Sequence, residues 1–169
     1  MGIFTPDLNS LREVYISKLQ HALNSERQIV EKGLPTMIEK ATNLTLQQAF
    51  RKHLEESRQH VMRLEQILND LEGEGGDKKC KVTTALLSAA ESAIGDAGNE
   101  GIRDVILIAA GNEIEHHEIA IYGTLRTWAE VLGERAHAAL LEATLEEEQA
   151  ADELLSGLAE EINIEVPAV

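Results

Sequence analysis

The sequence predicts an all-α fold, and three observations lead to this prediction. Only 3% of the 169 residues are aromatic, whereas Ala, Leu, Glu and Gln, which favour helices over strands, are abundant. Apolar residues recur at helical spacing in four long segments, and glycines or polar stretches separate these segments. Because 43% of the residues are hydrophobic, we expect one domain over residues 1–169, built around a single core.

The first two long helices are expected in the first half of the chain. One spans about 7–32, and the Gly-Leu-Pro sequence at 33–35 then bends or interrupts it. The other spans about 45–72, because Thr45 and Gln48 have the spacing of a capping box at its start. These two helices would form an antiparallel hairpin.

A long connection separates this hairpin from two further helices, which are expected over about 102–132 and 134–162. The connection carries a short amphipathic helix over about 84–94. Two hairpins of long helices joined in this way match a four-helix bundle with one long crossover. A simple up-down bundle with an excursion is the alternative topology.

The charge balance excludes several classes of partner. Asp and Glu number 30 against 15 Lys and Arg, so the formal net charge is −15, the wrong sign for binding nucleic acid. The uncharged stretches, such as Val105–Asn112, are all far shorter than the roughly 20 residues that span a membrane. Residues 1–10 do not resemble an export signal, and the single cysteine, Cys80, suits a reducing compartment. We therefore expect a cytoplasmic protein.

Each long helix carries a glutamate near its middle that lies on, or beside, the apolar face. On a helical wheel, Glu26, Glu115 and Glu148 share their direction with apolar neighbours in their own helices. Glu56 lies to one side of the apolar stripe of the second helix, at the point where His53 and two other polar residues break that stripe. The sequence thus places four carboxylates toward the interior of the bundle.

Four buried carboxylates need compensation. Burying one unpaired carboxylate costs several kcal/mol, against a stability of roughly 5–15 kcal/mol for a whole domain. The arginines are too scattered along the chain to pair with all four carboxylates. Divalent cations would neutralise them directly, and carboxylates with one or two histidines suit Fe²⁺ or Mn²⁺. We therefore expect two divalent metal ions, with iron the first choice and manganese the second.

The candidate ligands follow the pattern of a dinuclear site in a helical bundle, in which two helices give single glutamates and two give pairs. Alternatively, each glutamate lies at the edge of an apolar face and its carboxylate reaches water. This alternative applies especially to Glu118. His60 is either a ligand or a partner of a ligand, and His53 and His116 are expected as supporting residues rather than ligands. The candidate metal ligands are Glu26, Glu56, His60, Glu115, Glu118, Glu148 and Asp152.

These same stretches resemble the YciF/YciE-like bacterial proteins of the ferritin-like superfamily. The resemblance extends over all four long helices and rests on residues 25–28, 53–57, 115–125 and 145–152. It implies a ferritin-like bundle with a dinuclear metal centre, a homodimer and an association with bacterial stress responses. One departure is His60, because the family tends to carry Gln at that position.

Three functions are compatible with such a bundle. The first is a di-iron oxidoreductase that reacts with O₂ or H₂O₂, as a ferroxidase or a peroxide-reducing enzyme. The second is a non-catalytic metal-binding bundle that has a structural or partner-binding role. The third is iron storage in a hollow shell, although no sequence feature indicates the contacts of a shell.

Overall fold

The chain folds into a bundle of helices, as the sequence predicts. The structure is a computed structural model, and it describes residues 7–71 and 78–166. Within these residues there is no strand. The elements are α1 (Leu11–Gln28), the π-helical η1 (Ile29–Gly33), α2 (Leu34–Lys40), α3 (Leu44–Asp70), α4 (Lys81–Gly95), α5 (Glu100–Leu132), α6 (Arg135–Ile162) and the 3₁₀ turn η2 (Asn163–Glu165).

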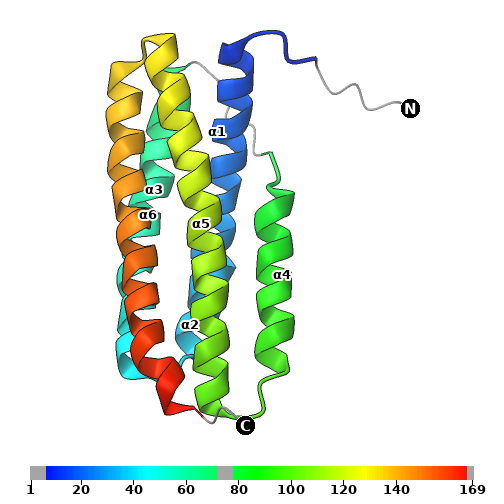
Figure 1. The fold of residues 1–169 in the computed structure, drawn as a ribbon. Helices are drawn as coiled ribbons and strands as arrows, with labels where there is room; N and C mark the ends of the chain where they lie inside the picture. The colour runs from blue at the N-terminus through cyan, green and yellow to red at the C-terminus, as the bar shows by residue number, and fades with distance from the viewer. Residues whose placement is uncertain (1–6, 72–77, 167–169) are drawn as a thin grey trace, which may run out of the picture.

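Two helical hairpins make up the bundle. The first consists of α1 with its continuation through η1 and α2, followed by α3; the second consists of α5 and α6 (Figure 1). The helices α3 and α5 run in the same direction (Figure 1). The helix α4, which follows α3 and precedes α5 in the chain, runs in the opposite direction and packs on the outside of the bundle against α1 and α5 (Figure 1). The bundle with one long crossover is therefore confirmed, and the simple up-down topology is not found.

The first hairpin departs from the expected helix bounds. The Gly-Leu-Pro sequence at 33–35 does not interrupt the helix, because one π-helical turn, η1, carries the chain directly into α2. Pro35 lies in the first turn of α2, directly after this π-helical turn. At the start of α1, the side chain of Ser10 accepts a hydrogen bond from the backbone of Glu13, so the helix begins later than position 7.

The other helix ends follow ordinary capping chemistry. The second long helix begins at Leu44 because the side chain of Asn43, rather than that of Thr45, accepts backbone hydrogen bonds at its start. Gly133 ends α5 with a φ of 80°, a conformation that glycine adopts without strain. None of the described helices is long and apolar enough to cross a membrane.

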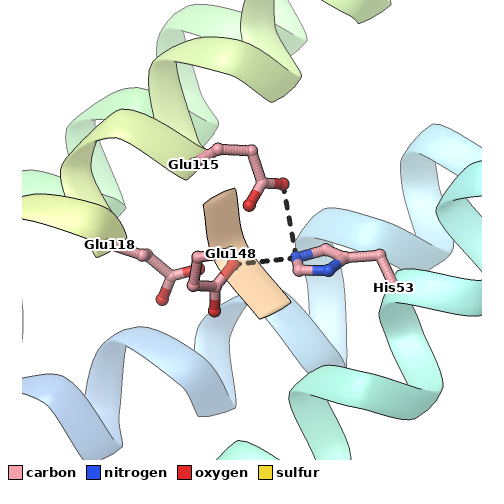
Figure 2. Close-up of side chains that lie close together, drawn as sticks. All are labelled: His53, Glu115, Glu118 and Glu148. Atoms are coloured by element: carbon pink, nitrogen blue, oxygen red, sulfur yellow. Dashed lines mark ion pairs between the residues drawn. The ribbon is translucent and has the colours of Figure 1, made fainter. Parts of the chain in front are cut away.

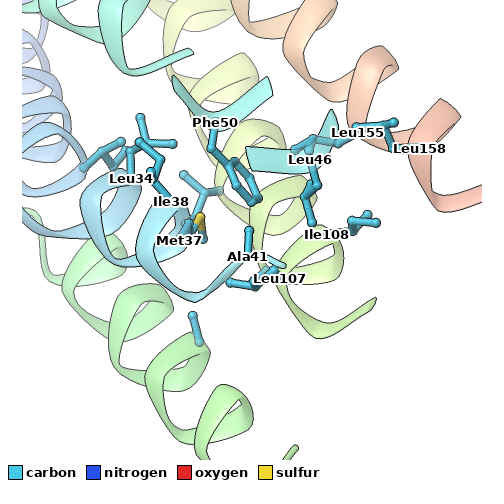
Figure 3. Close-up of a cluster of buried hydrophobic side chains, with 14 of the residues drawn as sticks. Leu34, Met37, Ile38, Ala41, Leu46, Phe50, Leu107, Ile108, Leu155 and Leu158 are labelled. Atoms are coloured by element: carbon cyan, nitrogen blue, oxygen red, sulfur yellow. The ribbon is translucent and has the colours of Figure 1, made fainter. Parts of the chain in front are cut away.

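The apolar core of the bundle is divided into two clusters. The first cluster joins α2, the start of α3, the start of α5 and the end of α6, with Phe50 and Leu155 among its members (Figure 3). The second joins α1, the end of α3, the end of α5 and the start of α6. Each of the four long helices passes from one cluster to the other near its middle. Six of the eight buried acidic and histidine side chains of the described residues lie at these four crossing points, whereas Asp104 and His137 lie nearer the ends of the bundle.

Candidate metal centre

Six acidic and histidine side chains are buried between the two apolar clusters. None of the six is more than 4% exposed, and three of them are completely inaccessible to solvent. They come from four helices, so that no single hairpin could form the arrangement. The six are Glu26 on α1, His53 and His60 on α3, Glu115 and Glu118 on α5, and Glu148 on α6.

Their possible ligand atoms form two groups. The first group contains His53, Glu115, Glu118 and Glu148, and Figure 2 shows these side chains pointing toward one another. The second group contains Glu26, His60 and Glu148, within the same 4.8 Å limit on the separation of ligand atoms. Glu148 belongs to both groups, which is the arrangement expected of a carboxylate placed between two cations.

In the first group, His53 faces two carboxylates. Its Nε2 lies 3.3 Å from Oε1 of Glu115 and 3.5 Å from Oε2 of Glu148 (Figure 2). On the other side of the group, the hydroxyl of Ser25 donates a hydrogen bond of 3.5 Å to Oε1 of Glu118. The group therefore offers one imidazole nitrogen and three carboxylates from three helices.

In the second group, His60 lies between carboxylates on both sides of its ring. Its Nδ1 is 2.9 Å from Oε1 of Glu148 and 3.2 Å from Oε1 of Glu26. Its Nε2 lies 2.8 Å from Glu147, which accepts a hydrogen bond there. The hydroxyl of Tyr122 donates a hydrogen bond of 2.5 Å to Glu26, which fixes that carboxylate from the side of the second apolar cluster.

Several polar atoms of this cluster have no hydrogen-bond partner among the described residues. They include Oε2 of Glu26, Glu115, Glu118 and Glu148, and both ring nitrogens of His53. A buried polar atom without a partner costs roughly 1–3 kcal/mol, and more if the group is charged. A cation would bind these oxygen and nitrogen atoms directly, so the residues present fit a pair of divalent metal ions.

The pKa values of the buried side chains also indicate that the cluster binds positive charge. Burial raises the pKa of Glu115 and Glu118 well above the ordinary range, and the neighbouring glutamates raise the pKa of Glu118 further. Burial also raises the pKa of Glu148. Burial alone would lower the pKa of His60, but the carboxylates of Glu26 and Glu148 outweigh it and raise the pKa to about 11. The cluster thus takes up positive charge, as protons or as metal ions.

Five of the seven predicted ligands lie together in the two groups, and two do not. Glu56 is 23% exposed, with Oε1 2.5 Å from Nζ of Lys52 and Oε2 3.7 Å from Nδ1 of His53. Asp152 is half-buried and lies 3.0 Å from Nδ1 of His116. Neither carboxylate belongs to either group, and Glu56 contacts the first group only through His53.

The sequence predicts that His53 supports a ligand without binding metal itself, whereas the structure includes His53 in the first group of possible ligands. A signal for this placement is present in the sequence. The buried positions of α3 follow one continuous stripe, and Glu56 lies outside it. That stripe consists of Leu46, Phe50, His53, Ser57, His60, Leu64 and Ile67.

Known proteins resemble this chain over nearly its whole length. Protein YciF of Escherichia coli K12 is 38% identical over 157 residues, which cover 90% of this chain and 92% of YciF. The crystal structure of YciF, described as an E. coli stress protein, has a TM-score of 0.89 at 35% identity and covers 94% of this chain and all of YciF.

A second solved structure, that of YcfI from Rhodopseudomonas palustris, has a TM-score of 0.87 at 34% identity. It covers 91% of this chain and 98% of YcfI. The family described as a domain of unknown function, DUF892, matches residues 10–166. That match includes all four long helices and every residue of the two groups of possible metal ligands. The chain therefore belongs to the DUF892 family, and YciF is a relative of it.

Proposed function

We propose that this protein is a dinuclear-metal carboxylate protein, with iron as the first choice of metal and manganese as the second. The observation that carries the proposal is the pair of ligand groups that share Glu148. His53, Glu115 and Glu118 would hold one ion, Glu26 and His60 would hold the other, and Glu148 would contact both. Oxygen and imidazole donors without thiolate suit Fe²⁺ and Mn²⁺.

The chemistry that such a pair of ions supplies is electron transfer to a small oxidant, O₂ or H₂O₂. The protein's own contribution is to bury the site and to orient the ligands. The apolar clusters above and below the centre keep bulk water away from it. Tyr122 holds Glu26 through its hydrogen bond, and Ser25 holds Glu118. The description of YciF as a stress protein supports a role in a stress response.

Metal analysis of the full-length protein tests the proposal. We expect two ions per chain after anaerobic loading with Fe²⁺ and removal of excess metal. Glu148→Ala should bind neither ion tightly, because both groups lose a shared ligand, whereas Glu26→Ala should retain about one ion, because it alters only the second group. A wild-type protein that binds no Fe²⁺ or Mn²⁺ would contradict the proposal.

A non-catalytic role is the second candidate. It is favoured by the description of the YcfI structure as that of a putative structural protein. Exposing the Fe²⁺-loaded protein to O₂ separates the two candidates. An absorbance change that shows oxidation of all the bound Fe²⁺ supports the oxidoreductase. Bound iron that stays in the Fe²⁺ state supports the structural role.

A further inference from the structure

A narrow surface pocket meets the metal centre between α3 and α6. Residues of both helices line it, and His53 and Glu115 form its inner end. Its volume of about 10 Å³ is close to the space that one water molecule needs. The pocket therefore has the size of a passage for a single small ion or molecule, and not the size of a substrate site.

The inner end of the pocket presents a buried imidazole ring that makes no hydrogen bond to any described residue. His53 is 4% exposed, and neither of its ring nitrogens makes a hydrogen bond within the described part of the chain. Nε2 faces Glu115 and Glu148 of the first group, while Nδ1 faces Glu56 on the side of the solvent. The ring of His53 thus stands between the centre and the outside.

The outer end of the pocket is formed by an ion pair. Lys52 and Glu56 both line the pocket, and their side chains are 62% and 23% exposed. The ammonium group of Lys52 lies 2.5 Å from one oxygen of Glu56, whose other oxygen is 3.7 Å from His53. Glu56 therefore reaches from the exposed surface to the first buried donor of the centre.

We propose that this pocket is the port through which divalent cations reach the metal centre, and that Glu56 is the carboxylate that first receives them. The proposal rests on the dinuclear function proposed above. A cation that leaves water must exchange its hydration shell for protein ligands, and Glu56 supplies such a ligand before the buried groups are reached. Lys52 competes with the cation for this carboxylate, so its ammonium group must move aside.

Another pocket of the same size offers a matched control. It lies between the η1–α2 segment and α4, and it also carries a Lys–Glu ion pair, with Nζ of Lys32 2.9 Å from Oε1 of Glu91. No residue of either metal group lines it. A change of charge at Glu91 therefore alters the surface in the same way as a change at Glu56, but away from the centre.

The test is the rate of Co²⁺ binding, measured by stopped-flow absorbance after CoCl₂ is mixed with the metal-free full-length protein. Glu56→Gln should slow association roughly tenfold, in the range of electrostatic effects on association rates, while the protein still binds two ions at equilibrium. Lys52→Gln should have the opposite effect and speed association. Glu91→Gln should leave the rate at the wild-type value.

Distinct results would overturn the proposal. Wild-type rates in both Glu56→Gln and Lys52→Gln, with two ions bound, would overturn the port and leave the dinuclear centre intact. Loss of one ion from Glu56→Gln at equilibrium would make Glu56 a ligand of the centre, as the sequence predicts, and not a residue of the port. A wild-type protein that binds no Co²⁺, Fe²⁺ or Mn²⁺ would overturn both the port and the centre.

Discussion

The orientation of His60 depends on residues outside the metal groups. Glu147 accepts a hydrogen bond from Nε2 of His60 and is held by Arg63 through both of its carboxylate oxygens, at 2.5 and 3.1 Å. A carboxylate can only accept, so Nε2 carries a proton toward Glu147, while Nδ1 faces Glu26 and Glu148, where a metal ion would replace its proton. This is the usual way in which a protein sets the ring orientation of a metal-binding histidine.

We therefore expect Glu147→Leu to weaken binding of the second ion, because His60 loses the acceptor that positions it. A loss of roughly 10- to 100-fold in affinity is typical when such a supporting residue is removed. Glu146→Leu is the matched control, since Glu146 is the exposed neighbour on the same helix. Competitive titration with a metal-binding dye measures both affinities. Equal affinities in the two variants would show that Glu147 does not position His60.

Single residues also show how far the site could be predicted from the sequence. Glu26, Glu115 and Glu148 could be found because each interrupts an apolar stripe that is otherwise continuous. On α3, Glu56 and His53 are three residues apart and point in similar directions on a helical wheel. The stripe of buried positions on α3 distinguishes them, because His53 lies on that stripe and Glu56 lies beside it.

At the scale of the helices, the centre requires α3, α5 and α6 to approach closely. Gly111 lies on α5 one turn before Glu115, and a Cβ atom there would come within 2.7 Å of Cδ1 of Leu155 on α6 and 3.5 Å of Phe50 on α3. Leu155 and Phe50 are themselves buried in the first apolar cluster, so an added methyl group would have to displace packed side chains. Glycine at this position therefore permits the close packing beside the centre.

We expect Gly111→Ala to destabilise the protein by about 1 kcal/mol, since overpacking costs roughly 1–3 kcal/mol and the higher helix propensity of Ala returns part of this loss. Gly123→Ala, in the same helix, should instead stabilise it by about 0.5–1 kcal/mol, because nothing lies within 4 Å of the added methyl group. Urea unfolding of the metal-free proteins measures both changes. The same sign in both variants would contradict this account of α5.

The helices were predictable to within a few residues because their ends depend on local chemistry, such as the left-handed Gly133 at the end of α5. The π-helical turn η1 was not predictable in this way. Proline and glycine at 33–35 ordinarily mark an interruption, but here Gly33 packs against α4, where an added Cβ would lie 2.9 Å from Cδ2 of Leu87. A contact with a helix more than 50 positions later leaves no local signal. The turn begins three residues after Glu26, and π-helical turns are often found near functional sites.

At the scale of the whole molecule, assembly separates the remaining functions. We propose a homodimer, as the family resemblance implies, rather than a storage shell. Size-exclusion chromatography with light scattering should therefore give a mass of about twice the 18.6 kDa of one chain. A mass many times larger would favour iron storage, and a monomer would remove the expectation of a dimer without affecting the metal centre, whose ligands all come from one chain.

Metal ions bound at the proposed centre would also stabilise the whole bundle, because ligands that bind only the folded state stabilise it. At a free ion concentration of about 100 times Kd, one bound ion contributes roughly 2.7 kcal/mol, which raises the Tm of a chain of this length by roughly 5–10 °C. Calorimetry of the protein with and without Fe²⁺ or Mn²⁺ should show this rise. A chelator should reverse it.

The variant Glu118→Gln should separate the cost of the buried carboxylates from the gain of metal binding. Without metal, Glu118 is a buried carboxylate that faces Glu26, Glu115 and Glu148, so replacing it with a neutral amide should leave Tm equal to or above that of the wild type. With metal, the same variant loses a ligand and should fall below the wild type. The exposed Glu160→Gln should change neither value. A Glu118→Gln protein that is less stable than the wild type by the same amount in both states would show that this carboxylate stabilises the core and does not bind metal.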